Sequence, residues 1–140
     1  NDYWTPALTP THEPRSRVVF NVDICGGLPA VVIRMLLASE PGLIDLLPAK
    51  PAAWPAGAVD GLPCRGQVLV KRLVWDGKRI AVTLRSERDQ TVVLRAPGRI
   101  GMISVRSGGA GIEPKGAPPD RRAVRLPAGR DVTIELRLTS

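Results

Sequence analysis

Aromatic residues, cysteines and histidines are scarce in this sequence, and their scarcity excludes several kinds of site. The 140 residues include one Phe, one Tyr, three Trp, two Cys and one His. By their spacing Cys25 and Cys64 form neither a disulfide framework nor a zinc site, and we expect both to be small buried apolar side chains. A single histidine, His12, does not complete a zinc centre. We therefore expect no metal and no cofactor.

Long apolar runs are also missing. The longest uncharged apolar stretch, Ile24–Ile33, is much shorter than the roughly 20 residues that a membrane-spanning helix needs. The first residue is Asn rather than Met, and no leader-like apolar segment follows it. We expect no membrane partner, and we interpret the chain as a segment of a longer protein.

Acidic residues are greatly outnumbered by basic ones in the second half of the chain. Residues 61–140 hold sixteen basic and seven acidic residues, whereas residues 1–60 hold four basic and six acidic residues. A basic half can indicate nucleic-acid binding. Here the arginines are spread singly over expected strands and turns, with no aromatic residues between them to stack on bases. We expect no nucleic-acid partner.

What the sequence has in quantity is glycine and proline, 14 of each, together with 44% hydrophobic residues. This composition is typical of short strands and turns around a real core. Before the strands, Val18–Asp23 is expected to be extended. A helix is predicted to begin at Pro29, to continue to Ser39 and to end before Pro41-Gly42. Because this helix is apolar around most of its circumference, it needs neighbours that bury it.

After the helix, the spacing predicts a short strand at Leu43–Leu47 and a proline-rich connector with Trp54 as its anchor. From Gly66 onward apolar residues alternate with polar ones, which predicts strands. The hairpin signal Asp76-Gly77 joins the first two. The six expected strands are Val68–Trp75, Lys78–Arg85, Gln90–Arg95, Ile100–Val105, Ala123–Leu126 and Val132–Leu138.

Six short strands at this spacing predict a mainly β fold with a C-terminal antiparallel β-sandwich. The expected organisation is a helical part at residues 1–50, a connector at residues 51–63 and the sandwich domain at residues 64–140. The helical part contains one apolar helix and no partner helix. The neighbours that bury this helix must come from missing upstream sequence or from the sheet alone, and we favour missing upstream sequence.

An ordered series of residues in the first half resembles the C-terminal part of glycoside hydrolase family 95. The series begins with Phe20-Asn21-Val22-Asp23, Met35-Leu36, Ser39, Pro41-Gly42 and Ile44, and continues with Leu46-Leu47-Pro48-Ala49, Pro51, Trp54-Pro55, Gly57, Gly61 and Arg65-Gly66. The resemblance covers residues 20 to about 86 and fades after them. It departs from the family pattern at Ile24-Cys25-Gly26 and at Arg34.

This resemblance implies that the helix is the last one of an (α/α)6 catalytic barrel, and that the β-sandwich packs on that missing barrel domain. The family's founding activity is an inverting α-L-fucosidase on terminal fucosides, so an oligosaccharide or glycan is the implied substrate. That substrate class implies a periplasmic or secreted location. The alternative from another class is a non-catalytic carbohydrate-binding or structural β-sandwich domain.

The resemblance also implies roles for three residues. Asp23 matches a catalytic-cleft carboxylate that supports the attacking water, while the acid and the water-activating asparagines lie upstream of this chain. His12 and Asn21 are implied to bind substrate. Each residue has an alternative: Asp23 could cap a helix or pair with Arg34, His12 could be a loop histidine, and Asn21 could hold a strand end.

Overall fold

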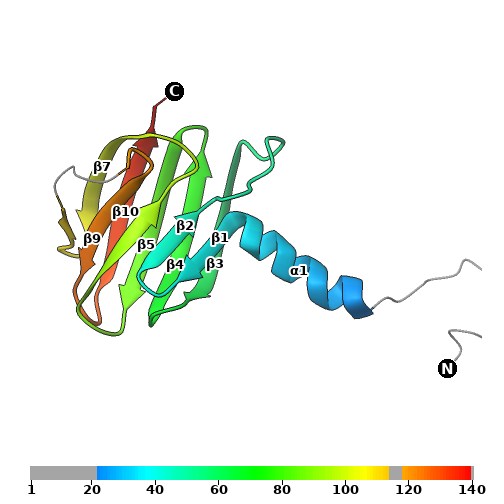
Figure 1. Cartoon of the computed structure of the whole chain (residues 1–140), viewed down its shortest axis with the longest axis horizontal. Helices are drawn as coiled ribbons and strands as arrows, with labels where there is room; N and C mark the ends of the chain where they lie inside the picture. Colours follow the sequence, from blue (N-terminus) through cyan, green and yellow to red (C-terminus); the bar gives the residue numbers. More distant parts are fainter. Residues whose placement is uncertain (1–21, 114–117, 140) are drawn as a thin grey trace, which may run out of the picture. The chain divides into compact units, whose positions relative to one another are not determined.

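The structure, a computed structural model, describes residues 22–113 and 118–139, with side chains from Gly27 onward. The chain divides into two units, Asn1–Val31 and Val32–Ser140. Helix α1 (Val22–Leu36) crosses the boundary between them, and every strand among the described residues belongs to the second unit (Figure 1).

Two five-stranded sheets make up the second unit. Across sheet A the order is β1 (Leu37–Glu40), β2 (Leu43–Leu46), β6 (Gln90–Arg95), β9 (Arg121–Leu126) and β8 (Gly111–Ile112). Across sheet B the order is β3 (Ala56–Cys64), β4 (Val68–Asp76), β5 (Arg79–Ser86), β10 (Asp131–Leu138) and β7 (Ile100–Ser107). The mainly β fold and the C-terminal β-sandwich predicted from the sequence are thus confirmed.

Neighbouring strands pair antiparallel, with one exception: β2 runs parallel to β6. The predicted Asp76-Gly77 hairpin joins β4 to β5, and Gly77 has the positive φ of 56° that such a turn requires. All six strands predicted after Gly66 are present, with ends that differ by two residues or fewer.

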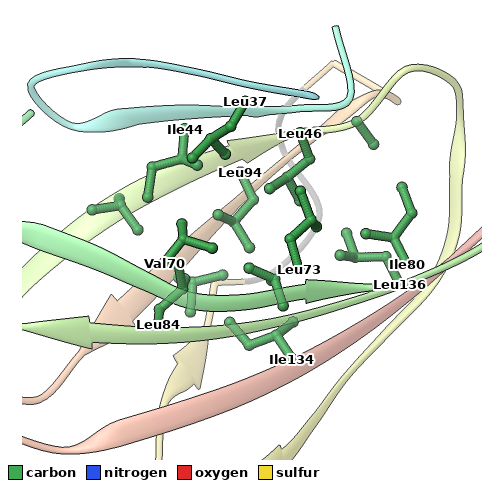
Figure 2. Close-up of a cluster of buried hydrophobic side chains, with 14 of the residues drawn as sticks. Leu37, Ile44, Leu46, Val70, Leu73, Ile80, Leu84, Leu94, Ile134 and Leu136 are labelled. Carbon is green, nitrogen blue, oxygen red and sulfur yellow. The ribbon is translucent and has the colours of Figure 1, made fainter. Parts of the chain in front are cut away.

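The hydrophobic core lies between the two sheets. Figure 2 shows Leu37, Ile44, Leu46 and Leu94 of sheet A pointing toward Val70, Leu73, Ile80, Leu84, Ile134 and Leu136 of sheet B. The alternation in β5 and β10 places one residue of every two in this layer. The residues between them, polar for the most part, therefore form the outer face of sheet B.

The helix differs from its prediction at both ends. It already includes Val22 and Asp23, which were expected in an extended stretch, and Pro29 lies inside it rather than in its first turn. Proline at that position removes one helical hydrogen bond, which the rest of the helix tolerates. At the other end α1 stops at Leu36, and the next four residues form β1, because they pair with β2. Residues 18–21 lie outside the described residues.

The proline-rich connector also differs from its prediction, because its second half is a strand. Residues 56–64 form β3, which pairs with β4 along almost its whole length despite containing Gly and Pro. The first strand of the sandwich, β1, begins before this connector, at Leu37. The side chain of Trp54, the expected anchor, is 38% exposed. Its backbone carbonyl oxygen accepts a hydrogen bond from Nε1 of the buried Trp75 at 3.1 Å.

Candidate functional site

Asp23, the carboxylate that the resemblance places in a catalytic cleft, is the second residue of α1. The alternative pairing of Asp23 with Arg34 stays a prediction. A role at the helix start stays open, because a carboxylate in the first turn interacts favourably with the helix dipole. The catalytic role of Asp23 stays a prediction.

The two residues expected to bind substrate, His12 and Asn21, lie outside the described residues. Their roles also stay predictions. The structure does bring together three polar clusters that sequence reasoning missed, one on sheet A and two on sheet B.

The first cluster lines a hollow of about 320 Å³ at one end of sheet A, with Pro48 and Pro97 on its wall. Arg95 Nη1 lies 3.6 Å from Asp45 Oδ2, and Arg95 Nε lies 3.5 Å from Asp120 Oδ2. Burial raises the pKa of Asp45, and the positive charge of Arg95 partly offsets that shift. At these distances the contacts are ion pairs rather than hydrogen bonds, so the hollow is lined by polar donors and acceptors.

The second cluster is built on Glu135, which lies on the outer face of sheet B in β10, next to the edge strand β7. Its side chain is only 4% exposed and is covered by three guanidinium groups, each more than half exposed. Oε2 accepts hydrogen bonds from Arg79 Nη2 at 3.0 Å and Arg106 Nε at 3.1 Å, and Oε1 accepts one from Arg137 Nε at 3.4 Å.

These contacts fix the charge of Glu135. The hydrogen bond from Arg79 lowers the pKa of Glu135 to about 2, with Arg106 adding to the shift and burial opposing it. The same bond raises the pKa of Arg79. The carboxylate is therefore ionised throughout the neutral range, and it organises arginines from three strands, β5, β7 and β10.

The third cluster lies farther along the same face. Asp131 accepts hydrogen bonds from Lys71 Nζ at 2.7 Å and from Arg85 Nη1 at 3.0 Å. The bond from Lys71, followed by that from Arg85, lowers the pKa of Asp131. Between the two sheet B clusters, the hydroxyl groups of Thr83 and Thr133 lie 3.0 Å apart.

Residues 22–113 and 118–139 contain neither a metal-binding cluster nor a membrane-spanning helix. No group of three or more His, Cys, Asp and Glu residues is placed to hold a metal ion there. None of the helices described is long and apolar enough to span a bilayer. Cys64 is a free, half-buried thiol, and burial raises its pKa, with a hydrogen bond involving Ser39 opposing the shift.

The sequence contained part of the signal for the sheet B clusters. Period-two alternation already assigned Arg79, Arg85, Glu135 and Arg137 to the polar faces of two strands. The pairing of β5 with β10, which brings those faces side by side, has no signal in either strand alone. Nothing in the sequence indicated the hollow at Asp45, whose parts come from three distant segments.

Comparison with known proteins points to one family. The model of "Glycoside hydrolase family 95, C-terminal domain" matches residues 38–134, which is more than half of the chain. A segment of 70 residues is 40% identical to "Alpha-L-fucosidase 2" of Arabidopsis thaliana, and it covers 49% of this chain and 8% of that relative. The matched segment thus spans less than a tenth of the relative's length.

Proposed function

The chain belongs to glycoside hydrolase family 95, whose C-terminal domain it carries, and on this premise we propose that it is the C-terminal part of an inverting α-L-fucosidase-like enzyme. The proposed substrate is an oligosaccharide or glycan that ends in fucose. The observation that carries the proposal is the family match, which spans most of the two sheets, together with the name of the relative.

In this proposal the chemistry takes place largely outside the described sandwich. An inverting glycosidase needs an acid on one side of the bond and a base that activates water on the other. Residues upstream of this chain supply the general acid and the asparagine amides that activate the attacking water. Asp23 supports that water. His12 and Asn21 contact the substrate. Because Asp23 lies at the start of α1, the helix would carry it into the cleft of the missing barrel.

The proposed partner of α1 is that barrel. Leu28, Val31 and Ile33 are large apolar side chains that are 56%, 55% and 42% exposed. Burying such a side chain stabilises a protein by about 1.5–3 kcal/mol. Exposed apolar residues gathered on one short helix are unusual for a finished surface, so they support a neighbouring domain that covers them.

The test uses the parent protein, produced with its natural upstream sequence. We expect it to release fucose from a glycan that ends in α-1,2-linked fucose, and the first product seen by proton NMR to be the β-anomer. Asp23→Asn should lower kcat by about 10²–10⁴-fold. Arg125→Gln, far from α1 in sequence and exposed on β9, is the control and should leave kcat unchanged.

Two results would contradict the proposal. Release of a different terminal sugar would refute the fucoside assignment while leaving the family in place. A parent without hydrolytic activity on any terminal glycoside would favour the alternative, in which the domain binds carbohydrate or serves a structural purpose.

A further inference from the structure

The outer face of sheet B carries two clusters of charged side chains that have no role in the proposed hydrolysis. We propose that this face binds a polyuronate, a glycan with a carboxylate on its repeating sugars, through the arginine cluster over Glu135 and the cation pair at Asp131. The inference goes beyond the proposed hydrolysis, and it depends on that function only in that the parent meets glycans.

The outer face of sheet B carries an excess of positive charge. Three guanidinium groups share Glu135, and the exposed Asp76, which pairs across the strands with Arg79, offsets them only in part. At the other cluster Lys71 and Arg85 share the single carboxylate of Asp131. Each cluster therefore keeps a net positive charge after its internal ion pairs are formed.

The guanidinium groups of this face also have N–H donors that are not directed at Glu135. Each guanidinium has five N–H bonds, and Arg79 and Arg137 each direct one nitrogen at Glu135. The Arg79, Arg106 and Arg137 side chains are 56%, 59% and 58% exposed, so their remaining donors are open to solvent. The buried carboxylate holds the three groups in place, which reduces the entropy lost when a ligand binds.

A ligand that carries carboxylates and hydroxyl groups fits this face. A carboxylate matches the planar fork of a guanidinium in a bidentate pair. The hydroxyl pair of Thr83 and Thr133 lies between the clusters and suits the hydroxyl groups of a sugar. A protein partner is disfavoured because protein interfaces have an apolar centre. Among the described residues of this face, Met102 is the one large apolar side chain that is exposed.

The presence of two clusters on one face favours a polymeric ligand. An exposed ion pair by itself contributes little to affinity. Asp131 and Glu135 lie four residues apart on β10, which places the two clusters about 13 Å from each other. A chain of several charged sugars engages both clusters at once, and the second contact then benefits from a high effective concentration. A monomeric uronic acid cannot do so.

The experiment measures binding of the 140-residue chain to polygalacturonate by isothermal titration calorimetry. We expect saturable binding that weakens as NaCl rises from about 50 mM to about 500 mM, because exposed charges are screened. Free galacturonic acid should not compete. The double variant Arg106→Gln/Arg137→Gln should lose about tenfold or more in affinity. It retains the Arg79–Glu135 pair, so the buried carboxylate keeps a partner.

The matched control is Arg34→Gln/Arg125→Gln, which removes the same charge from exposed positions on α1 and on β9 of sheet A. It should change the affinity less than about twofold. An equal loss in both double variants would mean attraction by net charge alone and would overturn the proposal. So would the absence of binding, equally tight binding of duplex DNA, or binding of a sulfated glycan without binding of polygalacturonate. None of these outcomes depends on fucosidase activity, which the parent enzyme reports separately.

Discussion

Arg122 Nη2 donates a hydrogen bond at 3.2 Å to the carbonyl oxygen of Ile100, and this contact joins sheet A to sheet B. Arg122 lies on β9 and is almost fully buried, while Ile100 begins β7. Its Nη1 donates a second hydrogen bond, at 2.7 Å, to the carbonyl oxygen of Arg121. A guanidinium group at the edge of the core thus satisfies two backbone acceptors.

Replacing Arg122 with Ala should therefore destabilise the sandwich. The substitution leaves the buried Ile100 carbonyl without this donor and removes the packing of a long side chain, at a cost of about 1–3 kcal/mol. Urea denaturation followed by circular dichroism measures it. Arg125→Ala on the same strand, where the side chain is exposed, should change the unfolding free energy by less than about 0.5 kcal/mol. If Arg122→Ala and Arg125→Ala lowered the unfolding free energy equally, the Arg122 hydrogen bonds would not have the stabilising role assigned to them.

Gly57 provides a second stability test, because it pairs across β3 and β4 with Trp75. A Cβ atom at Gly57 would overlap the six-membered ring of the buried indole. Gly57→Ala should thus cost about 1–3 kcal/mol, as overpacking does. Gly98→Ala is the control, since its Cβ would meet Leu138 Cδ1 at an ordinary 3.9 Å. If both variants melt at the wild-type temperature, the indole has room to move.

The lowered pKa of Glu135 makes the stability of the fold depend on pH. Its pKa is about 2 in the folded chain, below its ordinary value of 4.5, so ionisation favours the folded state. This contribution is complete above the ordinary pKa and is lost as pH falls through the folded one. Thermal melting should therefore show a stability difference between the wild type and Glu135→Gln that narrows from about pH 5 to about pH 2.5. A difference that does not depend on pH would contradict the assigned ion pairs.

The β-strands after Gly66 were predictable because their core residues alternate. Ile80, Val82 and Leu84 define the inner face of β5 by period alone, and Asp76-Gly77 defines its turn. β3 was not predictable. Its glycines and its proline indicate a loop, yet pairing with β4 overrides that preference, and Gly57 provides the space that Trp75 occupies.

The candidate sites were predictable to a smaller extent. Arg106 reaches Glu135 where the register between β7 and β10 shifts, between Thr133 and Ile134, and such a bulge has no sequence pattern that period two would reveal. The start of α1 was missed for a related reason. Gly26, Gly27 and Pro29 are helix breakers by propensity, but the helix runs through all three. Asp23 therefore lies inside a helix rather than at the end of a strand.

The exposed apolar residues of α1 give the last prediction. Leu28→Ser/Val31→Ser should change the free energy of unfolding of the isolated chain in urea by less than about 0.5 kcal/mol, because both side chains are already exposed. The double variant should aggregate less, as measured by light scattering, because it removes apolar surface. In the parent enzyme the same substitutions should lower the melting temperature, since each side chain buried against the barrel contributes about 1.5–3 kcal/mol. The opposite pattern, a destabilised isolated chain and an unchanged parent, would mean that α1 packs within this chain and has no barrel partner.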